Sequence, residues 1–209
     1  MFESLAGWVI VYYAFLWGVV VPFDLILRKK TPISLLGALA IRPVSGAGVV
    51  VFWLSLIGSA IVWVYPIVCV LQTGLVEAGL FQSNSFQIVG TLLICFSITL
   101  VTIAMVQIGR TYLPNQAELH LMTGGAYGLC RNPVYVGLAA GFLGVFLLLP
   151  SNVFLASWTL YLVCNHVRVR REESYLRMKL VREYEAYCRS VGRYGPRLKS
   201  LIRRHAARA

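Results

Sequence analysis

The sequence is poor in charged residues, and above all in acidic ones. Only 13% of its 209 residues are charged, and Asp and Glu together number 8 against 19 Lys and Arg. Soluble domains carry about a quarter charged residues and are about half apolar, whereas 58% of this chain is hydrophobic. The composition therefore argues against an ordinary soluble domain and indicates an integral membrane protein.

Patterns typical of metal sites and of disulfide frameworks are also missing. The five cysteines follow no Cys-x-x-Cys or other metal-like spacing, and no two of the three histidines are spaced as metal ligands. Three cysteines fall in or beside apolar runs, where cysteine is most simply a small core residue. Cys130 and Cys188 are expected on the cytoplasmic side, where disulfides rarely persist. We therefore predict no metal site and no disulfide.

Long apolar runs define the fold class. Three of them, 5–27, 47–71 and 86–106, are each long enough to cross a bilayer, which takes roughly 20 residues. A fourth run, 135–167, is too long for one crossing and contains the turn cluster Pro150-Ser151-Asn152. It predicts a tight hairpin of two helices, one over 133–149 and one from residue 152 onward. The expected fold is an all-α integral membrane protein with about five transmembrane helices.

The positions of the basic residues predict an orientation. With five crossings, the Lys and Arg residues at 28, 29, 30, 42, 110 and 131 and the thirteen after residue 165 all face one side, opposite Glu3 and Glu77. The positive-inside rule then predicts an amino terminus outside and a cytoplasmic carboxyl terminus. The basic tail is expected to contact anionic lipids. A short membrane-tethered basic run without interleaved aromatics argues against nucleic acid as a partner.

The two halves of the chain differ in character. Residues 1–106 are interpreted as a membrane scaffold of three helices, and residues 107–209 as a cofactor-binding half with a polar, glycine-bearing segment at 107–134. After the hairpin, apolar residues recur every three or four positions, which predicts an amphipathic cytoplasmic helix: Leu176, Leu180, Tyr184, Tyr187 and Val191. This helix is expected to fold back over the polar segment and to enclose a site at the membrane surface.

Arg131-Asn132-Pro133 stands at the start of the fourth apolar segment. Asn is a favoured N-cap residue and Pro is favoured at the first helical position, so the helix is expected to begin here. The free N–H groups of a first turn can bind an anion, and Arg131 adds a positive charge beside them. The alternative is that Asn-Pro only caps the helix and that Arg131 only anchors it at the lipid headgroups.

Glu172 and Glu173 form a second candidate constellation. Glu173 has Arg177 four residues after it and Arg170 three residues before it, which is typical of a solvated salt-bridge partner. Glu172 falls on the apolar stripe and is expected to point inward. An inward carboxylate needs a partner, either Arg168 or a cationic ligand such as an α-ammonium group. Together with Arg131, such a site would suit a zwitterionic amino acid.

Glycines and aromatic residues surround these charges. Gly124, Gly125 and Gly128 permit close backbone approach to a ligand, although such a glycine pattern is more often a plain turn. Tyr127 and Tyr135 could flank an adenine or a lipid tail, or could anchor the chain at the interface. His166 lies near Arg168 and Glu172 in sequence and could line the site, although a satisfied interfacial histidine is the simpler interpretation.

These residues, in this order, resemble the isoprenylcysteine carboxyl methyltransferase family, whose relatives include phospholipid N-methyltransferases. The resemblance covers roughly 107–200 and rests on five segments: Thr123 to Tyr127, Arg131 to Gly137, Glu172-Glu173, Tyr184 with Tyr187, and Gly195 to Leu198. The chain departs from the family pattern at Asn132, where His is frequent, at Gly125-Ala126-Tyr127 in place of Gly-Pro-Tyr, and at Val181-Arg182 in place of Phe-Gly.

The resemblance implies a membrane-embedded methyltransferase that uses S-adenosylmethionine. Its cofactor would lie between the loop before the fourth helix and the cytoplasmic end of the fifth. Glu172 or Glu173 would hold the ammonium or the ribose, and Arg168 would face the acceptor as the catalytic residue. The full set of expected cofactor-binding residues is Gly125, Tyr127, Arg131, Asn132, Pro133, Tyr135, Glu172 and Glu173.

The acceptor is expected to be lipophilic and to enter from the bilayer. Methyl transfer from a sulfonium is an in-line displacement in which positioning does most of the work. A carboxylate acceptor needs only a cation to align it, whereas an amine needs a base, so the arginines favour an isoprenylcysteine-type carboxylate or a thiol. Three alternatives remain at this point: an amine or phospholipid N-methyltransferase, an NADPH-dependent membrane reductase, and a non-enzymatic membrane adaptor.

Overall fold

The described part of the chain is helical. A computed structural model describes residues 2–30, 46–71, 83–112 and 121–197, and no strand occurs within these ranges. The long elements are α1 (Phe2–Phe15), η1 (Leu16–Val20) and α2 (Val21–Lys30), which run on continuously, then α3 (Gly46–Leu71), α4 (Asn84–Tyr112), α6 (Pro133–Leu148) and α7 (Asn152–Lys179). Two short helices, α5 (Ala126–Leu129) and α8 (Val181–Ser190), complete the order. The all-α prediction is confirmed.

The first helix contains a π-helical turn at η1. Proline lacks the N–H that an α-helix would bond to the carbonyl four residues earlier, and its ring collides with that carbonyl. Pro22 is the second residue after η1, and the N–H of Val21, between them, bonds to the carbonyl of Leu16 in the wider π pattern. The π turn thus lets one continuous helix pass a proline.

Four helices meet at Phe142, on α6. Its ring makes edge-to-face contacts with Tyr12 of α1, Trp63 of α3 and Tyr161 of α7, at centroid separations of 5.9, 5.9 and 5.2 Å. Aromatic pairs prefer this arrangement, which adds about 0.5–1.5 kcal/mol to each pair beyond burial. The first helices therefore pack directly onto those that carry the candidate site; the division into 1–106 and 107–209 stays a prediction.

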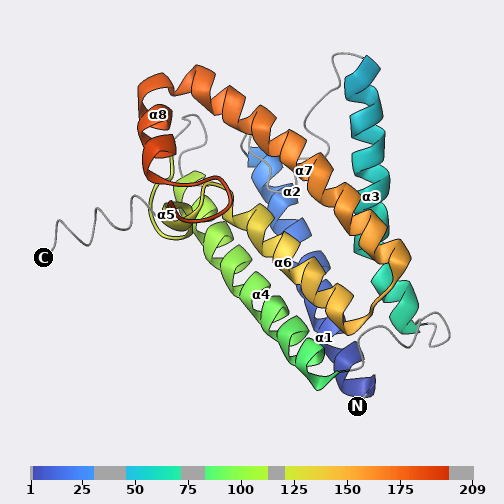
Figure 1. Ribbon diagram of the computed structural model, residues 1–209. Helices are drawn as coiled ribbons and strands as arrows, with labels where there is room; N and C mark the ends of the chain where they lie inside the picture. Colours follow the sequence, from blue (N-terminus) through green and yellow to red (C-terminus); the bar gives the residue numbers. More distant parts are fainter. Residues whose placement is uncertain (1, 31–45, 72–82, 113–120, 198–209) are drawn as a thin grey trace, which may run out of the picture.

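Glycines bring α4 and α6 close together (Figure 1). Gly137, Gly141 and Gly144 lie on one face of α6 because they are four and three residues apart. A Cβ at Gly137 would lie 2.6 Å from Val101 Cγ2, and one at Gly144 would lie 2.6 Å from the carbonyl oxygen of Gly90. Small residues at such positions let two helix backbones approach closely, as in membrane helix pairs.

The predicted hairpin is present as α6 and α7. α6 ends at Leu148 and α7 begins at Asn152, with Ser151 as the N-cap residue. The Ser151 hydroxyl accepts a hydrogen bond from the N–H of Phe154 at 3.5 Å. The turn cluster therefore ends one helix and starts the next within three residues.

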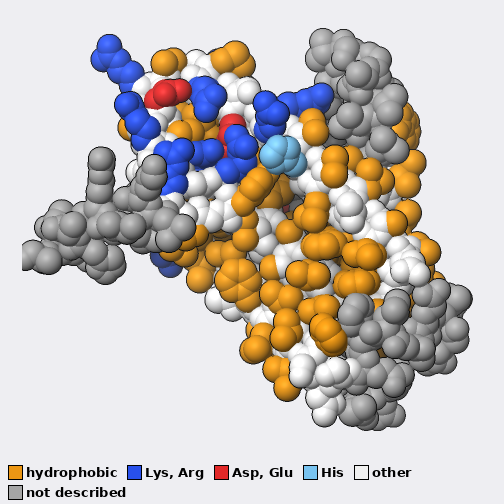
Figure 2. All heavy atoms as spheres, viewed as in Figure 1, with side chains coloured by type: hydrophobic (Ala, Val, Ile, Leu, Met, Phe, Trp, Pro, Cys, Tyr) orange, Lys and Arg blue, Asp and Glu red, His pale blue; other side chains and the backbone are white. Residues whose placement is uncertain are grey.

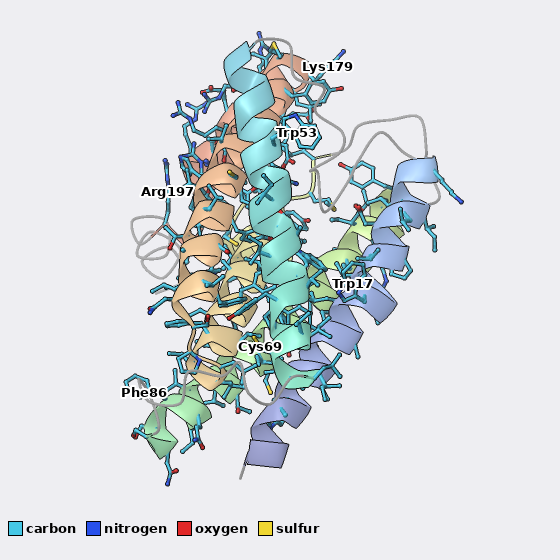
Figure 3. The ribbon with its side chains drawn as sticks, turned by 90° about the vertical axis from the view of Figure 1, so that its right-hand side faces the viewer. Trp17, Trp53, Cys69, Phe86, Lys179 and Arg197 are labelled. Carbon is cyan, nitrogen blue, oxygen red and sulfur yellow. The ribbon has the colours of Figure 1, made fainter. Side chains whose placement is uncertain are left out.

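Apolar side chains cover much of the outer surface. Two segments, Ala6–Leu27 and Asn84–Tyr112, are long and apolar enough to cross a membrane, and only 33% of the most apolar part of each is buried in the protein. A core helix of a soluble protein would be largely buried. Exposed apolar side chains also occur on α3 and α7, among them Trp53, Ile57, Val153 and Val163. Figure 3 shows Lys179 at one end of the helices and Phe86 toward the other.

The C-terminal stripe folds back as predicted, but it is not one helix. α7 ends at Lys179, and Leu180 takes φ −125° and ψ 56°, so that α8 turns away from α7 (Figure 1). Three stripe residues, Tyr184, Tyr187 and Val191, form a buried cluster, and the other two, Leu176 and Leu180, pack against it partly buried, as do Leu121 and Cys188. Periodicity alone could not show the break, because Lys179-Leu180-Val181 holds neither Pro nor Gly.

Basic side chains gather around α8 and the adjoining end of α7, while apolar side chains cover most of the remaining surface in the same view (Figure 2). In this view the molecule therefore has a basic end, at α8 and the end of α7, and an apolar remainder. Arg42, Glu77, the loop residue His120 and the basic tail after Arg197 lie outside the described residues.

Candidate functional site

Glu173 joins two arginines that are far apart in sequence. Its Oε1 accepts hydrogen bonds from Arg131 Nε at 3.1 Å and Nη2 at 2.9 Å, and its Oε2 accepts from Arg193 Nε at 3.0 Å and Nη2 at 2.7 Å. Only 5% of Glu173 is exposed. Burial opposes ionisation, but the hydrogen bonds from Arg193 and Arg131 hold the pKa of Glu173 below its usual value.

The prediction that Glu173 is a solvated partner of Arg177 and Arg170 is therefore wrong. Arg177 instead contacts Glu185 at 3.6 Å, and both side chains are more than half exposed. The helical spacing identified neighbours on the surface of α7, whereas the partners that Glu173 uses come from other segments. Arg193 was not among the expected site residues, and no local spacing connects it to Glu173.

Glu172 points inward, as predicted. The hydroxyl of Tyr135, on the first turn of α6, donates a hydrogen bond to Glu172 Oε1 at 2.8 Å. Burial raises the pKa of Glu172, while the Tyr135 hydrogen bond and the charge of Arg168 act in the opposite direction. The two adjacent acids thus have opposite pKa shifts: burial outweighs the other influences at Glu172, whereas hydrogen bonds and charge from two arginines outweigh burial at Glu173.

Arg168 lies buried beside the same tyrosine. Its Nη1 donates to Asn165 Oδ1 at 2.9 Å and its Nη2 to the Tyr135 hydroxyl at 3.4 Å. The guanidinium also lies 5.6 Å from the centroid of the Tyr135 ring, within cation–π range. About two turns of α7 and the first turn of α6 are thereby joined into a polar cluster of Tyr135, Asn165, Arg168 and Glu172.

A pocket of about 410 Å³ opens next to this cluster, between α6 and α7. Its walls come from the first turns of α6, from the middle of α7 and from the segment after α8. The lining residues are Tyr135, Val136, Ala139, Tyr161, Leu162, Asn165, His166, Val169 and Tyr194. Of the expected cofactor-binding residues, Tyr135 lines it. His166 lines the pocket as well. This favours the interpretation of His166 as a residue that lines the site over that of a satisfied interfacial histidine.

Three polar residues that line the pocket, Tyr161, Asn165 and Tyr194, were not predicted from the sequence. Asn165 interrupts an apolar run and could have drawn attention as a polar group inside a hydrophobic segment. Tyr161 looks like any core aromatic residue. Tyr194 lies in a short stretch between two glycines, and only the fold brings it to α7.

Arg131, Asn132 and Pro133 tie the C-terminal segment to the start of α6. Pro133 is the first residue of α6, as predicted, and Asn132 is at the N-cap position, but the Asn132 side chain makes no capping bond. Its Nδ2 instead donates to the Arg193 carbonyl at 3.2 Å. Arg131 donates from its Nη1 to the Val191 carbonyl at 3.0 Å and from its backbone N–H to the Gly192 carbonyl at 2.9 Å.

Gly125 has the only positive φ among the described residues, at 56°. The Gln107 side chain of α4 fits against this glycine, where a Cβ would collide with it, and its Oε1 accepts from the Ala126 N–H at 3.1 Å. Tyr127 follows in α5, and its carbonyl accepts from the Tyr187 hydroxyl at 2.7 Å. These residues fix the loop beneath α8, and neither Gly125 nor Tyr127 lines the pocket.

A comparison with protein families matches the region that carries most of these residues. Residues 86–182 match the phospholipid methyltransferase family. The chain is 28% identical over 111 residues to the nickel-cobalt-cadmium resistance protein NccN of Alcaligenes xylosoxydans xylosoxydans, an alignment that covers 51% of this chain and 52% of that protein. The chain thus spans about half the length of this relative. No solved structure gives a significant match.

The matched region runs from α4 through α7 to the first residues of α8, and it includes Arg131 to Gly137 and Glu172-Glu173. The resemblance that these motifs indicated is therefore confirmed at the level of this family: from residue 86 to residue 182 the chain is similar to the phospholipid methyltransferases, the family that includes the isoprenylcysteine carboxyl methyltransferases.

Proposed function

We propose that the protein is a membrane-embedded methyltransferase that uses S-adenosylmethionine to methylate a lipophilic acceptor. One observation carries the proposal. The pocket between α6 and α7 is built almost entirely from the segment that matches the methyltransferase family, because eight of its nine lining residues, all except Tyr194, fall within 86–182.

The residues around the pocket fit such a cofactor. Pockets for molecules of this size are about 300–1,000 Å³ and mostly apolar, with a few well-placed polar groups, and this one holds about 410 Å³. Tyr135 and Tyr161 offer aromatic faces, and Asn165 offers an amide. Glu172 does not line the pocket itself. It accepts a hydrogen bond from Tyr135, which does, so its carboxylate lies one contact behind the pocket wall, where it would attract an ammonium group.

We propose that the expected cofactor-binding residues fall into two groups, those that contact the cofactor and those that shape the walls around it. Tyr135 and Glu172 would contact the cofactor, which supplies a methyl group activated as a sulfonium. The others shape the walls: Gly125 and Tyr127 fix the loop under α8, and Arg131, Asn132, Pro133 and Glu173 join that loop to the C-terminal segment. Their own hydrogen bonds, described above, support this division.

For the acceptor we propose a lipophilic carboxylate of the isoprenylcysteine type. Arg168 is the buried cation nearest the pocket, and it binds two of its lining residues, Asn165 and Tyr135. An anionic headgroup would be attracted to this wall, and a carboxylate needs no base for methylation. Val136, Ala139 and Leu162 supply an apolar side for a lipid chain.

We further propose five membrane crossings, by the α1–α2 helix, α3, α4, α6 and α7, with the amino terminus outside. The apolar part of α7, residues 152–167, would cross, and its basic remainder would extend into the cytoplasm together with α8. The collection of basic side chains around α8 supports this orientation and would favour contact with anionic lipids (Figure 2).

The test is calorimetric binding of S-adenosylhomocysteine to detergent-purified protein. We expect saturable binding that Glu172→Gln weakens at least about tenfold, or roughly 1.4 kcal/mol. Glu183→Gln is the matched control, because Glu183 is exposed on α8 and should leave affinity unchanged. No binding in folded protein would overturn the proposal, and binding of NADPH instead would indicate a reductase.

The acceptor class is tested by methyl transfer to two lipids. A farnesylated cysteine carboxylate should be methylated, and Arg168→Gln should reduce that rate far more than it reduces cofactor binding. Preferential methylation of an aminophospholipid would overturn the carboxylate assignment and leave the cofactor assignment intact.

A further inference from the structure

The mouth of the pocket is marked by two residues. Of the nine lining residues, only His166 and Tyr194 are exposed; the other seven are buried or half-buried. His166 Nδ1 and the Tyr194 hydroxyl are 3.0 Å apart, within hydrogen-bond distance, and the two rings lie 5.9 Å apart. This pair therefore lies on the exposed side of the pocket, where a ligand that enters from solvent would meet it.

Tyr194 belongs to the non-helical segment after α8, and neighbouring residues hold that segment in place. Arg193 binds Glu173 through two hydrogen bonds, of 3.0 and 2.7 Å. Its carbonyl accepts from Asn132, and the carbonyl of Gly192 accepts from the N–H of Arg131. The segment thus rests on two supports, α7 through Glu173 and the start of α6 through backbone carbonyls.

The two contacts on α7 are in register. Glu173 and His166 are seven residues apart, which is about two helical turns, so they lie on one face. On the other side, Arg193 and Tyr194 are adjacent. One face of α7 therefore binds two consecutive residues, the arginine through its charge and the tyrosine through its hydroxyl.

We propose that residues 192–195 form a gate over the pocket, that Tyr194 closes it against His166, and that Glu173 is a positioning residue that holds the gate shut through Arg193. This inference rests on the pocket of the proposed function, but not on the identity of its ligand. Glu172 and Glu173 then differ in role: Glu172 faces the ligand through Tyr135, whereas Glu173 controls access.

The structure favours a gate over a fixed wall because the residues that hold the segment against α7 are partly exposed, whereas the ion pair behind them is buried. Arg193 is 35% exposed, and Tyr194 is 42% exposed, so both can leave α7 without opening the core. Arg131, by contrast, is 8% exposed and would keep its own bonds to Glu173 when Arg193 departs. Opening therefore breaks a half-exposed ion pair while the buried one stays intact.

The experiment measures access to the pocket directly. Ala139, which lines the pocket, is replaced by Cys, and the rate of its modification by a small methanethiosulfonate is followed peptide by peptide with mass spectrometry. The native Cys69, buried in α3, reports general loosening in the same sample. No cofactor or acceptor is needed, so the outcome is independent of whether the protein is a methyltransferase.

In this background, Arg193→Gln and Tyr194→Ala should each speed modification of the cysteine at 139 about tenfold or more and leave Cys69 unchanged. Tyr194→Phe, which keeps the ring and loses the hydroxyl, should give an intermediate rate. Arg182→Gln, at an exposed position on α8, is the matched control and should have no effect. Arg193→Gln is preferred to a change at Glu173 because it leaves the Arg131 pair in place.

Unchanged rates in the Arg193 and Tyr194 variants would overturn the gate, as would an equal increase at Cys69. A wild-type rate in Tyr194→Phe would exclude the hydrogen bond to His166 from the closure. If the labelling result holds and S-adenosylhomocysteine fails to bind, the gate stands and the proposed function does not.

Discussion

Two contacts in this protein show two ways of holding helices together. α4 and α6 meet through glycines, and the contact has no ionic component in the residues described above: the backbones lie against each other, and Gly137 and Gly144 leave no room for a side chain. At the other end, α7, the start of α6 and the segment after α8 meet through Glu173 and its two arginines.

The difference follows from what surrounds each contact. Within the apolar part of the bundle, an unpaired polar group would be costly, so close packing provides the attraction. At the basic end, where α7 leaves the apolar part, hydrogen bonds between ionised groups fix three segments in one arrangement. Close packing resists any displacement, whereas a half-exposed ion pair such as Arg193–Glu173 can open. The site lies where the second kind of contact begins.

The largest effect should come from removing the shared carboxylate. Glu173→Ala leaves Arg131 buried without its charge partner, and breaking a buried pair in this way costs about 3–5 kcal/mol. Glu185→Ala is the comparison, because the exposed pair Arg177–Glu185 should contribute about 1 kcal/mol or less. Reversible unfolding in mixed micelles measures both. Similar losses in the two variants would show that the Glu173 network contributes no more than a surface pair.

A somewhat smaller loss should follow from filling the glycine contact. In Gly144→Val, the new side chain would meet the backbone of Gly90 and the side chain of Ile94, and overpacking of this kind costs about 1–3 kcal/mol. Gly7→Val is the matched control, since nothing lies within 4 Å of a Cβ at Gly7. The same unfolding measurement applies, and a tolerated Gly144→Val would mean that α4 and α6 can separate freely.

Features that depend on local sequence could be predicted, whereas contacts between segments far apart in the chain could not. Apolar runs and the Pro150-Ser151-Asn152 turn located the long helices and the hairpin, because helix length and turn chemistry are local properties. The inward orientation of Glu172 also followed from helical period. The partners of Glu173 could not be predicted, since Arg131 and Arg193 lie 42 and 20 residues away in sequence and only the fold brings them together.

Tyr194 shows the same limit at the pocket. The C-terminal stripe correctly indicated that the chain folds back. The break at Leu180, however, determines the position of the segment that follows. The contact between Tyr194 and His166 depends on that position. The motif resemblance agrees with the family match over residues 86–182, whereas the contact between Tyr194 and His166 required the tertiary arrangement.

The smallest effect concerns pH, and it separates the two adjacent acids. Burial raises the pKa of Glu172 above its ordinary value of 4.5, so its contribution to stability is present below that value and is lost as pH rises through the raised pKa. The arginines lower the pKa of Glu173, so its contribution is present above 4.5 and is lost as pH falls through the lowered pKa.

Thermal midpoints of wild type, Glu172→Gln and Glu173→Gln, measured from about pH 7 to about pH 3, around the range in which carboxylates titrate, should show these opposite trends. The advantage of wild type over Glu173→Gln should shrink on acidification, because protonation removes the charge that both arginines need. As pH rises, the thermal midpoint of wild type should fall relative to that of Glu172→Gln, because the neutral amide avoids burying a charge. If the two differences changed with pH in the same direction, the opposite pKa shifts of these neighbours would be contradicted. In that case Glu173 would not be the acid whose charge the arginines Arg131 and Arg193 neutralise.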